Sequence, residues 1–149
     1  MAITERMRGD DGSASLEFIT VGMILLVPLV YLVLVLSAVQ GGALAVEGAA
    51  RQAARVYVLA ADEDAGTAGA TRAVEVALAD YGLENQPVTM QVDCENPDRC
   101  LTPRSGVTVT VRVVVPLPLV PDVLSLSDVA ALPVEATATQ TVSRFWRAG

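Results

Sequence analysis

The 149-residue sequence contains no histidine and no lysine, so arginine supplies all ten of its basic side chains. The missing histidines exclude Ser-His-Asp triads and histidine metal sites, and the missing lysines exclude Schiff-base chemistry. The sequence also has no G-x-S-x-G nucleophile motif and no glycine-rich phosphate loop. We therefore expect a protein that is not an enzyme and that uses no cofactor and no metal.

Basic charge is scarce as well, because seventeen acidic residues give the chain a net charge of −7. This balance argues against a nucleic-acid partner, since phosphate binding needs a basic face. The only two cysteines, Cys94 and Cys100, have a spacing that is neither a C-x-x-C redox motif nor half of a zinc site. A disulfide formed outside the cytoplasm is the natural interpretation, and two free thiols are the alternative.

One long apolar run, Phe18 to Val39, stands near the N-terminus. As a helix it would be about 33 Å long, which is enough to cross the hydrocarbon of a bilayer. A cleaved secretory signal, ending at the "ALA" of 43–45, is the alternative. The run is longer than the roughly 7 to 15 apolar residues of such a signal, however, and the preceding leader is rich in acids. The sequence therefore favours a retained single-pass anchor.

Arg6 and Arg8 precede the run, so the N-terminus is expected in the cytoplasm and the C-terminal part outside it. Pro28 lies within the run, where a membrane helix tolerates a kink. Gly41-Gly42 offers a bend where the helix would leave the lipid.

Glu17 stands directly before the apolar run, and no other charge follows it until after Ala45. An ionised group at the centre of a bilayer costs about 2.5–3.5 kcal/mol, and less near the interface, so such a residue suggests a function. The alternative is that Glu17 is merely solvated at headgroup depth. If the chain were cut between Gly12 and Ser13, Glu17 would be the fifth residue of the new chain.

The stretch "GSASLEF" resembles the cleavage region of type IV pilin precursors, in which a short hydrophilic leader ends in Gly and the fifth mature residue is Glu. The resemblance implies that a membrane prepilin peptidase cuts after Gly12 and that Ser13 becomes the new terminus. It also implies that Glu17 pairs with an amino terminus inside a filament. One difference is that Asp10 and Asp11 precede Gly12, where such leaders often carry a base.

A larger part of the chain is similar to the TadE-like family of minor pilins or pseudopilins of the tight-adherence (Flp-type) pilus. The similarity lies in "GSASLEFITVGMILLVPLVYLVLVLSAVQGGALAVEGAARQAARVY", then in "VTVTVRVVVPLPLVPDVL", and finally in "LPVEATATQTVSR". It implies a structural role in pilus assembly and adhesion. The implied partners are membrane lipid, a prepilin peptidase, other pilin subunits and pilus assembly proteins.

The residues after the apolar run predict two helical segments. From Ala43 to Ala60 the sequence is Ala-rich, and Glu47 and Arg51 stand at i and i+4. Asp62-Glu63-Asp64 with Gly66 predicts a loop, either a solvated turn or, with less support, a calcium site. A second helix is expected from about Thr67 to Tyr81 with Gly82 after its end, because apolar residues recur at helical spacing. The predicted stripe consists of Ala70, Ala73, Val74, Ala77, Leu78 and Tyr81.

Three runs of alternating apolar and polar residues then predict strands at 88–94, 107–113 and 134–142. Period-two alternation indicates a sheet with one solvated face. We expect the first two strands to form a hairpin closed by "CENPDRCLTPRSG", a loop with too little apolar content to order itself unless a Cys94–Cys100 bond clips it. The second helix is expected to cover the dry face of the sheet.

Two segments remain open in function. The proline-broken link "PLPLVPDVLSLSDVAALP" either covers a sheet edge or exposes apolar residues to a subunit or a membrane surface. These apolar residues are Leu117, Leu119, Val120 and Leu124. The terminal "SRFWRAG" is a pilus contact, an interfacial membrane anchor or a frayed tail.

The expected fold class is α+β, with a long N-terminal transmembrane helix that continues into an outer domain. That domain would contain one packing helix and a small antiparallel sheet of about three strands. The expected divisions are a cytoplasmic leader at 1–12, a pilin-like transmembrane helix at 13–42 and an extracytoplasmic α+β domain at 43–149. A constitutively anchored cell-envelope protein whose outer domain binds a ligand or partner is the alternative function.

Overall fold

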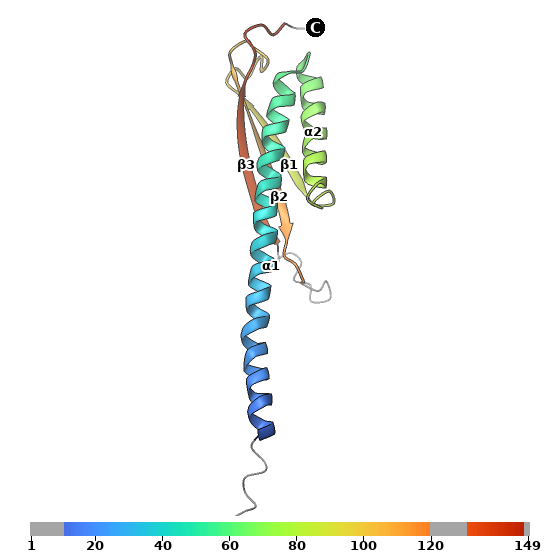
Figure 1. Cartoon of the computed structure of the whole chain (residues 1–149). Helices are drawn as coiled ribbons and strands as arrows, with labels where there is room; N and C mark the ends of the chain where they lie inside the picture. The colour runs from blue at the N-terminus through green and yellow to red at the C-terminus, as the bar shows by residue number, and fades with distance from the viewer. Residues whose placement is uncertain (1–10, 120–130, 148–149) are drawn as a thin grey trace, which may run out of the picture. The chain divides into compact units, whose positions relative to one another are not determined.

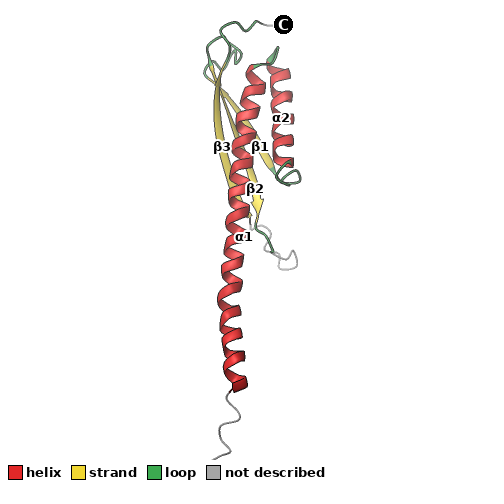
Figure 2. Cartoon of the chain, in the orientation of Figure 1, coloured by secondary structure: helices red, strands yellow, loops and turns green. Residues whose placement is uncertain are grey.

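A computed structural model describes residues 11–119 and 131–147, with side chains from Ala14 onward. Its elements are helices α1 (Asp11–Val58) and α2 (Glu63–Ala79) and strands β1 (Val88–Cys94), β2 (Gly106–Pro116) and β3 (Ala131–Thr141) (Figures 1 and 2). The predicted α+β class is confirmed. The chain divides into two units, one up to Leu36 and one from Ser37 onward.

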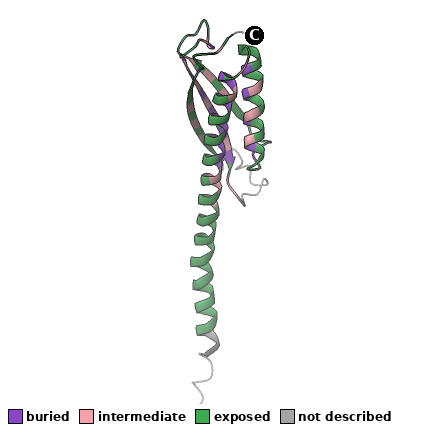
Figure 3. Ribbon diagram, turned by 45° about the horizontal axis from the view of Figure 1, so that its top comes forward, coloured by how far each residue is buried: buried purple, intermediate pink, exposed green. Residues whose placement is uncertain are grey.

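The described part of the first unit is the beginning of α1, and its residues from Ala14 to Leu34 are exposed on all sides of the helix (Figure 3). The exposed side chains are mostly large and apolar, from Leu16 and Phe18 through Ile24 and Leu29 to Leu36. Pro28 lies inside the helix without ending it. By length and composition, α1 is the one helix in the described residues that is long and apolar enough to cross a membrane.

The second unit contains a three-stranded antiparallel sheet in the order β1-β2-β3. Val113 of β2 stands opposite Val88 of β1 and Val134 of β3, which fixes the register. One face of the central strand consists of five valines with exposed fractions of 0–3%: Val107, Val109, Val111, Val113 and Val115. The other face is polar and solvated, as the alternation predicts. On that face the Thr108 and Thr139 hydroxyls lie 2.9 Å apart and Arg112 forms an ion pair with Glu135.

The dry face of the sheet is covered by two helical segments, α2 and the part of α1 that follows Ser37 (Figure 1). The prediction gave this role to the second helix alone and was therefore incomplete. Alanine makes the extra contact possible, because its short side chain lets a helix approach the valines closely. The buried residues of this part of α1 are Ala45, Val46, Ala49, Ala50, Ala53, Ala54, Tyr57 and Val58.

Glycines mark the closest approaches between these elements. A Cβ built on Gly42 would lie 2.4 Å from Cγ2 of Val115, and one on Gly69 of α2 would lie 2.8 Å from Cγ1 of Val56. Helical structure continues through Gly41 and Gly42, so the predicted bend is not a break in α1. Gly42 instead allows the contact between α1 and β2.

Helix α2 begins four residues before the predicted start. Asp62, predicted to lie in a loop, is the N-cap, and its Oδ1 accepts a hydrogen bond from the Ala65 N–H at 2.7 Å. Glu63 and Asp64 occupy the first turn, where negative charge complements the helix dipole. The loop prediction was wrong because the three acids are start signals for a helix.

The end of α2 follows the prediction at Gly82, which has a φ of +71°. The Leu83 N–H donates to the Leu78 carbonyl, and the Gly82 N–H donates to the Ala79 carbonyl, which is the Schellman pattern. Tyr81 lies beyond the last helical turn and is 51% exposed, so its predicted place in the core stripe was wrong.

Strand β1 has the predicted bounds, and the other two strands differ by a few residues. β2 continues to Pro116, and β3 begins at Ala131 rather than Val134. The extra residues pair with one another, since Val114 stands opposite Pro133 and Pro116 opposite Ala131. Proline is compatible with these positions because they lie at strand ends or on an edge strand.

Candidate assembly site

The candidate site is the beginning of α1, where Glu17 stands among exposed apolar side chains. Its neighbours Leu16 and Phe18 are both exposed. Neither of the two ion pairs in the described residues includes Glu17. The Thr20 hydroxyl donates to the Leu16 carbonyl at 2.7 Å, so this nearby polar group has a partner within its own helix. The Glu17 carboxylate is thus free for a partner outside this part of the chain.

Gly12 and Ser13, the predicted cleavage residues, lie in the first turn of α1, which begins at Asp11. Ser13 and Glu17 are four residues apart in the sequence, which is about one turn of helix. The peptide bond between Gly12 and Ser13 is part of the helical backbone, so a peptidase that binds an extended substrate would first have to unwind this turn. Cleavage at this bond stays a prediction.

The apolar segment between Glu17 and the second unit has the length of a bilayer core. Phe18 to Leu36 comprises 19 residues, which at 1.5 Å each extend about 28 Å. A hydrocarbon core is about 30 Å thick. Glu17 would therefore lie near one boundary of the hydrocarbon when Leu36 lies near the other.

The predicted cysteine pair lies at the end of β1. The Sγ atoms of Cys94 and Cys100 are 2.02 Å apart, and their Cα atoms are 5.2 Å apart. The Cys100 N–H donates to Oε1 of Glu63 at 2.8 Å, so the loop is also fixed to the first turn of α2. The prediction from the sequence did not include this contact with α2.

The hairpin loop contains further internal contacts. Glu95 pairs with Gly106 through the backbone, and its Oε2 also accepts from the Gly106 N–H at 2.9 Å. The Ser105 hydroxyl donates to the Thr102 carbonyl at 2.7 Å, and Leu101 is buried in the core. Leu101 and these hydrogen bonds therefore help to hold the loop in addition to the Cys94–Cys100 pair.

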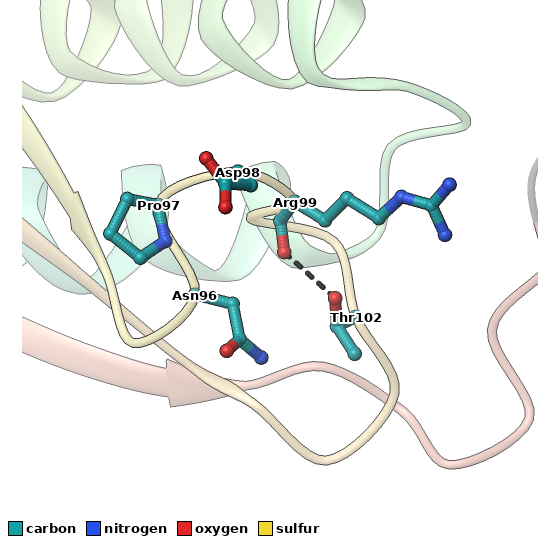
Figure 4. A pocket seen from close by; sticks show the side chains of 5 residues that line it. All are labelled: Asn96, Pro97, Asp98, Arg99 and Thr102. Carbon is teal, nitrogen blue, oxygen red and sulfur yellow. Dashed lines mark hydrogen bonds between the residues drawn. The ribbon is translucent and has the colours of Figure 1, made fainter.

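Two shallow hollows lie on the second unit. One, of about 300 Å³, is lined by Asn96, Pro97, Asp98, Arg99 and Thr102, and the Thr102 hydroxyl donates to the Arg99 carbonyl at 2.8 Å (Figure 4). The other, of about 380 Å³, is lined by Arg55, Val58, Leu59, Gln140, Thr141 and Ser143. Throughout the described ranges, no three metal-ligating side chains of His, Cys, Asp or Glu gather into one group.

The C-terminal tail is docked through Trp146. Its indole Nε1–H donates to the Ala60 carbonyl at 2.8 Å, and the ring is half-buried against the core. Phe145 is 74% exposed, with the Arg144 guanidinium 4.5 Å from its ring centre. The interpretation of this segment as a frayed tail is therefore wrong for Trp146, which is bonded to the residues that follow the end of α1. The N–H of a buried indole needs an acceptor, and this requirement is the signal that sequence reasoning missed.

The proline-broken link is described only in part. Leu117 is half-buried and Leu119 is 75% exposed, while Val120 and Leu124 lie outside the described residues.

Glu47 and Arg51 form the predicted ion pair on α1.

Comparisons with protein-family models, curated proteins and solved structures find no match to this chain.

Proposed function

We propose that the chain is a pilin-like structural subunit, a minor pilin or pseudopilin of a tight-adherence type pilus assembly. The apolar part of α1 anchors it in the membrane, with the N-terminus in the cytoplasm and the unit from Ser37 outside. A prepilin peptidase removes the leader after Gly12. Other pilin subunits and assembly proteins then take the helix from the lipid into a filament or its assembly machine.

The observation that carries this proposal is an apolar helical segment, residues 18–34, that is exposed on every side and has Glu17 directly before it. A helix that is apolar all round is suited to lipid, and it is equally suited to a bundle of identical helices. In such a bundle an unpaired carboxylate is costly, whereas a carboxylate beside an ammonium group is compensated. Cleavage after Gly12 would create an ammonium group on Ser13, one helical turn away.

Orientation and compartment rest on independent features of the sequence and the second unit. Arg6 and Arg8 precede the apolar run, and positive residues favour the cytoplasmic side. Cys94 and Cys100 are at bonding distance, and disulfides persist in oxidising compartments. Both features are consistent with a second unit that lies outside the cytoplasm.

The N-terminus of the protein isolated from its own cells tests the proposal. Intact-mass spectrometry is expected to find a chain that begins at Ser13. A start at Met1 or Ala2 would instead favour a constitutively anchored envelope protein. That alternative has some physical support, because the Gly12–Ser13 bond lies in a helical turn and follows two acids.

Replacement of Glu17 tests the assembly role. The Glu17→Leu variant is expected to remain in the membrane fraction, because the helix becomes more apolar, but to be lost from the sheared pilus fraction or the assembly complex. Glu47→Leu is the matched control, since the Glu47 side chain is also exposed on α1 but lies in the second unit. Equal incorporation of both variants would refute a role for the Glu17 carboxylate in assembly.

A further inference from the structure

The end of the β2–β3 pair carries exposed apolar side chains. Leu119 is 75% exposed and Leu132 is 44% exposed, whereas Leu117 is half-buried. Leu119 also has a φ of +62°, a backbone conformation that is uncommon for a residue other than glycine. We call the residues 116–119 and 131–133 the apolar tip.

The apolar tip lies at the end of the second unit where the α1 part of this unit begins, near Ser37. Val115 packs against Gly42, which is five residues, or about 8 Å, from Ser37. β2 runs toward the N-terminal end of this helical segment (Figure 1). At about 3.3 Å per extended residue, Leu117 lies about 7 Å beyond Val115, which brings it close to the level of Ser37.

The chemistry of the apolar tip fits a membrane surface. The sequence has no charge from Val113 to Leu119 or from Ala131 to Val134. Arg112 and Glu135, which flank these stretches on the sheet side, are paired with each other on the solvated face of the sheet. Asp122 and Asp128 stand between Leu119 and Ala131 in the sequence, outside the described residues. The prolines at 116, 118 and 133 carry no backbone N–H, so they leave fewer donors without partners in a region poor in water.

Two other exposed apolar side chains of the second unit, Leu59 and Val76, have polar neighbours. Leu59 shares a hollow with Arg55, Gln140 and Ser143. Val76 on α2 stands four residues from Arg72 and from Asp80, which share its side of the helix. The apolar tip therefore differs from the scattered apolar residues that are normal on protein surfaces.

We propose that the apolar tip rests in the boundary between lipid headgroups and acyl chains, so that the outer unit is held against the membrane at a second point besides its helix. The proposal rests on the membrane anchoring proposed above. A lipid surface fits better than a second copy of the chain, because three leucines cannot provide the 1,200 Å² or so that a stable protein interface buries. A chain that is already tethered needs only a small apolar contact to keep this position.

Spin labels on single added cysteines of the full chain test the inference. The chain is reconstituted in vesicles of phosphatidylethanolamine and phosphatidylglycerol, and the labels are placed by Leu119→Cys, Val27→Cys and Leu59→Cys. Val27 lies in the apolar helix, and Leu59 is the matched exposed leucine far from the apolar tip. Non-reducing peptide mapping first verifies that Cys94 and Cys100 remain joined. Collision rates with oxygen, which enters lipid, and with a water-soluble nickel complex are then compared.

The label at Leu119 is expected to resemble the label at Val27, with a several-fold lower nickel collision rate than the label at Leu59. A label at Leu119 that is as accessible to nickel as the label at Leu59, while Val27 reports lipid, would overturn the inference and leave the anchor intact. A label at Leu119 shielded from both reagents would also overturn it, because protein and not lipid would then cover the apolar tip. Nickel access at Val27 would instead refute the proposed anchor.

Discussion

The contact between Gly42 and Val115 gives the sharpest test of how the outer unit is packed. Replacing Gly42 by alanine adds one methyl group in the middle of α1. That carbon would lie 2.4 Å from Cγ2 of Val115, whereas ordinary contacts begin at 3.4 Å. The matched control is Gly41→Ala, because a Cβ on the neighbouring Gly41 meets nothing within 4 Å.

Two opposing effects set the expected magnitude. Alanine stabilises a helix interior by about 0.8–1 kcal/mol relative to glycine, and this gain applies to both variants. Overpacking in a well-packed core costs about 1–3 kcal/mol, and this cost applies only to Gly42→Ala. Val115 is 3% exposed and stands on the central strand, so it has little freedom to move aside. We therefore expect Gly41→Ala to be more stable than Gly42→Ala by about 1–3 kcal/mol.

Urea unfolding of the full chain in mild detergent micelles measures this difference. The single tryptophan, Trp146, is half-buried against the core and provides the fluorescence signal. A double variant that adds Val115→Ala to Gly42→Ala should recover part of the loss, because it removes the clashing methyl groups. Equal stabilisation by Gly41→Ala and Gly42→Ala would refute the packing of α1 on β2 described above.

Two more predictions concern the end of the outer unit away from Gly42. Trp146→Phe should lower the free energy of unfolding by about 1 kcal/mol, because it removes the donor to the Ala60 carbonyl but keeps an aromatic ring. Circular dichroism recorded during thermal unfolding measures this loss. Phe145→Ala, at an exposed position, is the near-neutral control, and an equal loss in both variants would contradict the docking of Trp146. Replacing Cys94 and Cys100 together by serine should cost about 2 kcal/mol, from the loop entropy of a separation of 6 residues. Equal stability of the double variant and the oxidised wild type would contradict this prediction.

The strands were predictable because each carries its information in short-range alternation. Val88 to Cys94 and Val107 to Val113 place every second residue on the same face, and the structure buries the valine face of the central strand. The wet face followed from the same pattern, including the pairing of threonines across β2 and β3. The end of α2 was predictable for a similar reason, since a glycine there permits the positive φ that terminates a helix.

The errors came where one residue type has two structural uses. A run of acidic residues is compatible with either a solvated loop or the start of a helix. The hydrogen bond from the Ala65 N–H to the Asp62 carboxylate shows that this run starts a helix. A pair of glycines is compatible with either a bend or a close approach of two elements. The proximity of Val115 shows that Gly42 serves the close approach. Long-range hydrogen bonds, such as those from Cys100 to Glu63 and from Trp146 to Ala60, join positions that no local pattern connects.

The size of the apolar side chains distinguishes two environments along α1. Before Ser37 the apolar residues are mainly leucine, isoleucine and valine on all sides, and they are exposed. After Ser37 the buried residues are mostly alanines at spacings of three and four, which form one narrow face. Large side chains on every side suit a fluid environment that adapts to them, whereas small side chains on one face suit a rigid sheet approached at close range. The change from leucine and valine to alanine therefore indicates, within one continuous helix, where packing against the protein's own sheet begins.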